Sequence, residues 1–183
     1  MNKTEAVKEI SGATLLHNFY AADLRGGFLK VLQRSQLPKK LQILDFCEGF
    51  ISTSRKNVIR GMHFQTPPYD LEKLVTVVTG SVMDVVFDMR KESPTFGNVF
   101  SIKLGESEKF RSLFIPKGCA HGFLALEDNS MMLYQTTCEF NPEHDTGIAY
   151  NSIGFDWNIP ESEIIISEKD RNLPPWCPEE TPF

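Results

Sequence analysis

The chain of 183 residues lacks the features that mark several large classes of protein. No apolar run approaches the length of about 18 residues that a membrane-spanning helix needs, so we expect no membrane partner. The N-terminal segment MNKTEAVKEISGATLLHNF has neither a long apolar stretch nor an Ala-x-Ala-like cleavage site, which argues against a secretion signal. The glycine-rich loops GxGxxG and GxxxxGK[ST] are missing, which argues against Rossmann-type and P-loop nucleotide binding. The GxSxG nucleophile elbow is missing too.

Basic charge and cysteine are also scarce. The net charge of -5 and the sequence pI near 5.4 argue against a nucleic-acid partner, although a few local Lys and Arg can still hold a phosphate. None of the four cysteines lies in a CxxC pair, so we expect a reduced, cytoplasmic protein whose thiols are packing residues. With 41% apolar and 23% charged residues, the composition is that of one ordinary globular domain, residues 1–183.

Short apolar runs fill the middle of the chain, from about Phe46 to Thr137. The runs are LVTVVTGSVMDVVFDM, NVFSIKL, SLFIP, GFLALE and MMLYQTT, and the turn residues around them include Thr79-Gly80, Ser93-Pro94, Lys117-Gly118 and Asp128-Asn129. Such spacing predicts an all-β sandwich or barrel. In the first run Val85, Phe87 and Met89 alternate with Asp84, Val86 and Asp88, as in a strand with two unlike faces. Helix is expected only at the flanks, around Leu29–Leu37 and near the C-terminus, where PPWCPEETPF predicts an irregular tail.

Two of the four histidines lie in surroundings that suggest chemistry. His63 lies in the strand-like run VIRGMHFQTPP, and His121 follows a Pro-x-Gly turn in IPKGCAHGF. A satisfied histidine in the core or at the surface is an equally good interpretation of either from pattern alone. Pro116, Gly118 and His121 match half of the second cupin motif, but the stretch around His63 lacks the second His of the metal-binding first motif. Because a catalytic metal usually needs about three protein ligands, we expect no metal and favour acid–base chemistry.

Three further side chains are open to two interpretations each. Lys73, at the start of a strongly apolar run, is either a strand-end lysine with its ammonium in water or a cation that meets a developing oxyanion. Tyr134 is either a core aromatic with its hydroxyl at the surface or a functional group. Asp170, in SEKD, has a solvated loop carboxylate as its commoner interpretation. Residue pattern alone leaves all three unresolved.

Taken together, these segments resemble the dTDP-4-dehydrorhamnose 3,5-epimerase family. The resemblance runs from about Tyr20 to Leu173 and rests on DLRGGF (23–28), RGMHFQ (60–65), EKLV (72–75), SPTFG (93–97), IPKGCAHGF (115–123), LYQTT (133–137) and SEKD (167–170). Each motif alone is weak, but their joint order and spacing make a chance match implausible. The resemblance implies a cupin-type antiparallel β-barrel (jelly roll) with short flanking helices, a homodimer, and no metal or organic cofactor.

The resemblance also implies roles for individual residues. His63 would be the active-site base, paired with Asp170. Lys73 would lie near the sugar O4, and Tyr134 would be the acid on the opposite face. Positions that contact substrate or phosphate are Arg25, Arg60, His121 and Lys169. The implied activity is epimerisation at C3, C5 or both of a nucleoside-diphosphate 4-keto-6-deoxy sugar or 4-keto heptose.

The chain departs from the family pattern at three positions. Glu48 and Phe50 stand where the family commonly has Gln and Asn, in a stretch that helps to hold the nucleotide. This difference favours a guanosine or cytidine diphosphate over dTDP. Phe140 replaces a residue that is usually Tyr, which removes a hydroxyl near the sugar and bears on the carbon inverted or the size of the sugar.

Two other functions remain compatible with the sequence. A cupin 3,4-ketoisomerase on the same substrates would share the barrel but would not need His63 and Asp170 opposite Tyr134. A catalytically silent sugar-nucleotide-binding relative is the other alternative, and the joint presence of Lys73 with those three residues argues against it.

Overall fold

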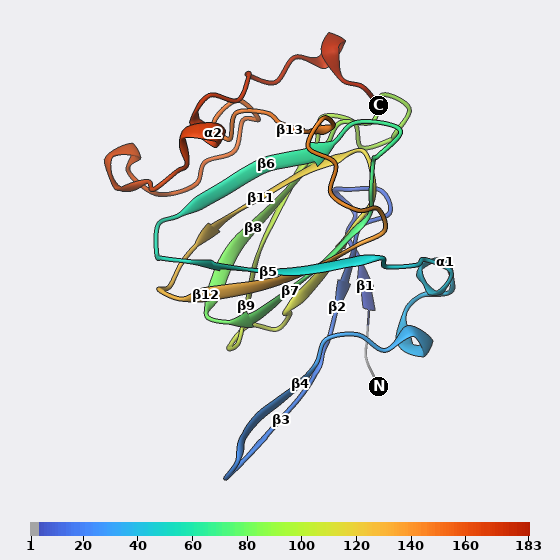
Figure 1. Cartoon of the computed structure of the whole chain (residues 1–183), viewed down its shortest axis with the longest axis vertical. Helices are drawn as coiled ribbons and strands as arrows, with labels where there is room; N and C mark the ends of the chain where they lie inside the picture. Colours follow the sequence, from blue (N-terminus) through green and yellow to red (C-terminus); the bar gives the residue numbers. More distant parts are fainter. Residues whose placement is uncertain (1–3) are drawn as a thin grey trace.

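Two antiparallel β-sheets packed face to face form the body of the computed structural model, which describes residues 4–183 (Figure 1). The first sheet runs in the order β1 (Thr4–Ala6), β2 (Thr14–Leu16), β10 (Ser112–Ile115), β7 (Lys73–Thr79), β12 (Ser130–Thr136) and β5 (Glu48–Ser54). The second runs in the order β13 (Asp145–Gly147), β6 (Ile59–Gln65), β11 (Cys119–Ala125), β8 (Ser81–Asp88) and β9 (Val99–Gly105). The all-β prediction is therefore confirmed.

Both faces of β8 are buried, which explains the alternation in its sequence. Val82 and Val86 point into the interior between the sheets, where they join the main hydrophobic core. Val85 and Phe87 belong to a second core on the outer face of the sheet. The C-terminal segment covers that face, and the ring centroids of Trp176 and Phe87 lie 4.9 Å apart. The irregular C-terminal tail thus packs against the outer face of the second sheet and covers it.

Helix is confined to short turns, but the helix predicted around Leu29–Leu37 was wrong. The helices are α1 (Lys39–Gln42) and α2 (Glu168–Arg171), with single 3-10 turns at Arg34–Gln36, Glu161–Glu163 and Pro178–Glu180. The start of the predicted helix is a strand, because Leu29 pairs with Tyr20 across a hairpin, and Pro38 disfavours helical backbone just before it. Within residues 4–183 no helix is long and apolar enough to cross a membrane.

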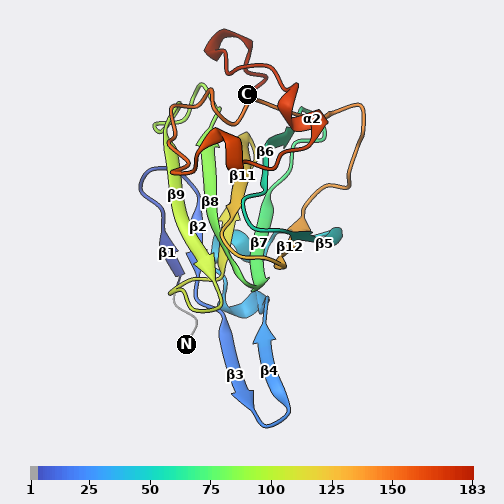
Figure 2. The same ribbon diagram turned by 90° about the vertical axis from the view of Figure 1, so that its left-hand side faces the viewer.

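A hairpin of β3 (Phe19–Asp23) and β4 (Gly26–Lys30) projects away from the two packed sheets (Figure 2). All of β3 and most of β4 are exposed. The exposed apolar side chains include Phe19 and Phe28 on the strands and Leu24 in the turn between them. Exposed apolar surface of this kind marks an interaction site more often than a free surface.

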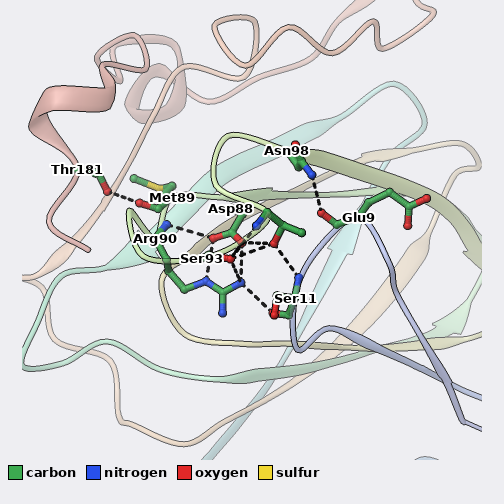
Figure 3. A network of polar contacts seen from close by, with 9 residues as sticks. Glu9, Ser11, Asp88, Met89, Arg90, Ser93, Asn98 and Thr181 are labelled. Carbon is green, nitrogen blue, oxygen red and sulfur yellow. Dashed lines mark hydrogen bonds and ion pairs between the residues drawn. The ribbon is translucent and has the colours of Figure 1, made fainter.

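The fully buried carboxylate of Asp88 lies at the centre of a polar network at the end of β8 (Figure 3). It accepts hydrogen bonds from Nε and Nη2 of Arg90, at 2.8 and 2.6 Å, and from the hydroxyls of Ser93 and Thr95. Arg90 also donates to the carbonyl of Ser11, whose own amide donates to Thr95. The SPTFG motif therefore holds the β8–β9 loop against the N-terminal segment, which is a structural role.

Candidate active site

A cleft of about 290 Å³ opens between the two sheets. It is lined by Phe50, Ser52, Arg60, His63, Lys73, His121, Gly122, Phe123, Tyr134, Phe140 and Asp145. These residues come from β5, β7 and β12 of one sheet, from β6, β11 and β13 of the other, and from the loop after β12. The fold thus gathers in one cleft most of the side chains that the sequence singled out.

His63 and Asp170 form a hydrogen-bonded pair at this cleft. A parallel bridge between Val58 and Ile165 brings the C-terminal segment beside β6, and α2 follows at once. His63 Nε2 lies 2.9 Å from Asp170 Oδ1, and the amide of Gly61 donates to Oδ2 at 3.1 Å. Burial raises the pKa of Asp170, but the bonds from His63 and Gly61 outweigh it and hold the pKa below its ordinary value. Asp170 is therefore a buried, ionised carboxylate and not a solvated loop residue.

Lys73, the first residue of β7, turns its ammonium into the cleft and not into water. Its Nζ donates to the carbonyl oxygen of His63 at 3.2 Å. Burial lowers its pKa to about 8, although Asp145 and Asp84 act in the opposite direction. A cation held next to His63 in the cleft is suited to stabilise a developing oxyanion.

Tyr134 of β12 faces the same cleft and is 9% exposed. Burial raises the pKa of its phenol, so it stays protonated across the physiological range. Its ring meets the ring of His121 edge-on, with centroids 6.1 Å apart, and stacks on Phe50 of the neighbouring strand. The phenol of Tyr134 is therefore neutral, and its ring is packed between Phe50 and His121.

His121 lies opposite His63 in the register of β11 and β6, but it has a carboxylate of its own. Its Nε2 lies 2.9 Å from Oδ2 of Asp84, and both residues are buried. The other oxygen, Oδ1 of Asp84, is buried and has no hydrogen-bond partner in the part of the chain that the structure describes. Our reading of the sequence missed Asp84 as a site residue, although its place on the interior face of β8 is the signal that could have revealed it.

Two side chains hold the loop that carries Phe140. Oε2 of Glu48 accepts a hydrogen bond from the amide of Phe140 at 2.8 Å. Oε1 of Gln65 accepts from the amide of Asn141, and its Nε2 donates to the carbonyl of Glu139. The donor that Glu48 meets is thus a backbone amide, and Phe140 is fixed at the mouth of the cleft with its ring 57% exposed.

The basic side chains are placed less uniformly. Arg60 lies at the rim, where its guanidinium bonds to the hydroxyl of Ser54 and the carbonyl of Thr53. Lys169 pairs with Asp145 and lines an adjoining open hollow of about 470 Å³, which also contains His63 and Arg60. Arg25 lies in the turn of the β3–β4 hairpin, paired with Asp23, and is not among the residues that line the cleft. The hairpin that carries it projects away from the two sheets (Figure 1).

Among the described residues, 4–183, no group of three or more His, Cys, Asp or Glu side chains is arranged to hold a metal ion. His63 and His121, the two candidate ligands, each bind a carboxylate through Nε2. This donor arrangement favours proton transfer over coordination.

Both the sequence and the fold of the chain are similar to those of one family of known proteins. Residues 7–177 match the model of the family described as dTDP-4-dehydrorhamnose 3,5-epimerase. The proteins of that name from Escherichia coli and Methanothermobacter thermautotrophicus are 39% and 37% identical to the chain, covering 90% and 91% of it and 90% of each relative. A crystal structure of the epimerase from Legionella pneumophila in complex with dTDP-4-keto-L-rhamnose superposes with a TM-score of 0.86, at 31% identity over 96% of this chain and 93% of that one. The predicted all-β, cupin-type fold (an antiparallel jelly roll with short flanking helices) is thereby confirmed.

Proposed function

This chain belongs to the dTDP-4-dehydrorhamnose 3,5-epimerase family, and on that premise we propose that it inverts C3, C5 or both of a nucleoside-diphosphate 4-keto sugar without a cofactor. That it is a nucleotide-sugar epimerase, an isomerase acting on carbohydrates, follows from the family itself. The proposal concerns which carbons are inverted, which residue takes each role in the reaction, and which nucleotide the sugar carries.

The first step is removal of a proton from the carbon beside the ketone. Since Nε2 of His63 donates to the ionised Asp170, its Nδ1 carries the free lone pair and accepts the proton. The electrons of the broken C–H bond form the C=C bond of an enolate, and its negative charge moves to O4. Asp170 stabilises the imidazolium that results.

The enolate oxygen needs a positive charge close to it, because the hydrogen beside a ketone is otherwise too weakly acidic. Lys73 supplies this charge, since its ammonium is held beside His63 in the cleft. Removal of one oxyanion donor typically costs about 3–4 kcal/mol of transition-state stabilisation.

Inversion requires a proton from the other face, which we assign to Tyr134. Its O–H bond breaks as the new C–H bond forms, the enolate electrons return to carbon, and the C4 ketone is restored. The phenolate that remains recovers a proton from solvent and His63 releases one, so no net proton is consumed. The observation that carries the whole proposal is the meeting of His63, Lys73 and Tyr134 in one cleft.

The test is incubation with a panel of 4-keto nucleotide sugars in D2O, with deuterium at each carbon read by NMR. Exchange together with inversion at C3, C5 or both supports the proposal. Movement of the ketone between C3 and C4 would identify a ketoisomerase. Tight binding without exchange at any carbon would identify a catalytically silent relative.

The nucleotide is not dTDP in this proposal. Glu48 puts an acceptor-only carboxylate where the family commonly has an amide, and one of its oxygens already takes the amide of Phe140. The other oxygen, Oε1, is left to accept from a base amine such as those of guanine and cytosine. Phe50 and Phe140 add exposed aromatic surface at the mouth of the cleft.

We also keep the homodimer as part of the proposal. The projecting β3–β4 hairpin exposes Phe19, Leu24 and Phe28, and a second copy is a natural cover for them. Assembly would further explain Arg25, which lies in the turn of this hairpin away from the cleft of its own chain, because a second copy could receive the hairpin at its cleft. The four cysteines are free thiols, which favours a reducing compartment such as the cytoplasm.

A further inference from the structure

Phe50 and Tyr134 lie directly opposite each other on β5 and β12 and stack face to face. Their ring centroids are 4.7 Å apart, and the ring planes differ by 11°. Both side chains line the cleft, but Tyr134 is buried whereas Phe50 is 46% exposed. Phe50 therefore covers one face of the phenol ring and separates it from solvent.

The other surroundings of Tyr134 belong to better-anchored elements. Val75, its neighbour across the register, lies on β7 in the middle of the sheet and is fully buried. His121 contacts the ring from the opposite sheet and is itself held by Asp84. β5, in contrast, lies at the edge of its sheet and, among residues 4–183, pairs with β12 alone. Phe50 and Ser52, both on β5, are thus neighbours of the phenol that lie on an edge strand, and Phe50 is the one that covers the face of the ring.

We propose that Phe50 is a positioning residue for Tyr134 and sets how many enolate intermediates are protonated on the face opposite His63. The inference rests on the proposed role of Tyr134 as the opposite-face acid. Placing a donor within reach of a carbon is sensitive to displacements of about 1 Å, so a ring that tilts loses productive geometry. A parallel aromatic neighbour restricts that tilt in a way that an aliphatic side chain of similar volume does not.

The side chain of Phe50 has no polar atom, so it cannot donate or accept a proton itself. Its substitution should leave proton abstraction by His63 intact and change only the fate of the enolate. An enolate that Tyr134 fails to protonate is protonated again by His63 on the first face. In D2O the proton on His63 exchanges with solvent, so this step leaves deuterium in a sugar of unchanged configuration. The quantity to measure is the ratio of inversion to deuterium incorporation with retention.

The experiment compares the wild type with Phe50→Leu and Phe50→Tyr at saturating substrate, following both processes by NMR. We expect the ratio to fall about threefold to tenfold in Phe50→Leu, the factor that corresponds to the loss of an aromatic pair. Phe50→Tyr keeps the stack and should restore the ratio to within about twofold. The matched control is Ile51→Ala on the same strand, an exposed neighbour that does not line the cleft and should leave the ratio unchanged.

Binding of the nucleoside diphosphates dTDP, GDP and CDP, measured by calorimetry, separates this role from base stacking. Under the proposal the ratio at saturating substrate falls in Phe50→Leu whether or not the affinity for these nucleotides changes, because the ratio is decided at the enolate, after the substrate has bound. An unchanged ratio in Phe50→Leu, with or without weaker nucleotide binding, would overturn the proposal. Should Phe50→Leu fail to fold, Phe50→Met serves in its place, read in the same way. A wild type that shows neither exchange nor inversion would instead refute the proposed function, so the two failures are distinguishable.

Discussion

His63 and Asp170 are 107 residues apart in the chain, yet their side chains meet at 2.9 Å. The contact depends on the strand-like pairing of Val58 with Ile165, which lays the C-terminal segment along β6. Ser167 then caps α2, because its hydroxyl accepts the amide hydrogen of Asp170 at 3.0 Å. The orientation of the proposed base is therefore a property of the C-terminal segment.

His63→Asn should abolish deuterium exchange at every exchanging carbon, because it removes the proposed base. Asp170→Asn should reduce exchange by about 10²–10⁴, because an amide no longer holds the proton on Nε2 or stabilises the imidazolium. The double variant should be no slower than His63→Asn, as expected for residues that act as a unit. NMR in D2O measures all three, with Asp45→Asn on the surface as the control. Exchange like that of the wild type in His63→Asn would reject the assignment.

Deprotonation of Lys73 should make kcat/KM fall at alkaline pH, the alkaline limb of the pH profile. Burial lowers its pKa to about 8, and only the protonated ammonium stabilises an enolate, so kcat/KM should fall about tenfold per pH unit above that value. Lys73→Arg keeps its charge and should lose this limb, although at lower activity. Lys73→Gln should lose about 10²–10³ in kcat. A limb that persists unchanged in Lys73→Arg would place the titrating group elsewhere.

Tyr134→Phe should separate exchange from inversion. His63 still removes the proton, exchanges it for deuterium from D2O and delivers deuterium to the same face, so deuterium incorporation should continue. Net inversion should slow by about 10²–10⁴, the usual contribution of a general acid. Polarimetry together with NMR gives both rates, and an equal loss of the two would show that Tyr134 supports the first step instead.

The sequence predicted best what depends on neighbouring residues. The hairpin turn at Thr79-Gly80 is one example, since Gly80 has φ of 72°, a conformation that favours glycine. The alternating residues of β8 are another, because a period of two defines the faces of a strand. The helix predicted around Leu29–Leu37 failed because pairing with β3 overrides local preference, and this pairing extends out of the core.

The site was predicted less evenly. Pattern alone left Asp170 and Lys73 unresolved, since their burial depends on contacts between segments far apart in the chain. The resemblance to a family supplied roles for both, but it offered nothing on Asp84 beneath His121 or on the stack between Phe50 and Tyr134. Those features require the register of paired strands, which a single sequence does not specify.

Asp88→Asn should destabilise the fold by about 2–4 kcal/mol at pH 7, because Arg90 loses the partner of a largely buried ion pair. The estimate is below that for a fully buried pair, since the side chain of Arg90 keeps 25% of its surface exposed. Urea unfolding measures the difference, and the exposed Asp45→Asn should stay within about 0.5 kcal/mol of the wild type.

The same pair predicts how stability depends on pH. Burial raises the pKa of Asp88, but the hydrogen bonds from Arg90, Ser93 and Thr95 outweigh it, so the folded-state pKa lies below the ordinary value. Its contribution is then complete above the unfolded pKa of about 3.9 and is lost as pH falls through the folded pKa. The difference in free energy of unfolding between the wild type and Asp88→Asn should therefore become smaller below about pH 4. A difference that is constant from pH 7 to pH 3 would show that Asp88 contributes nothing through its charge.

The nucleotide can be identified by calorimetric titration of the wild type with dTDP, GDP and CDP. We expect GDP or CDP to bind at least about tenfold more tightly than dTDP, because Oε1 of Glu48 can accept from a base amine, which thymine lacks. Glu48→Gln, which restores the residue common in the family, should narrow that preference by allowing the side chain to donate as well as accept. Since Glu48 also holds the amide of Phe140, Phe140→Leu is the control that separates a displaced loop from a changed base contact. Phe140→Leu should weaken the binding of all three nucleotides by the same factor, whereas Glu48→Gln should change their affinities relative to one another. A clear preference of the wild type for dTDP would refute the hypothesis and assign Glu48 to the support of the loop alone.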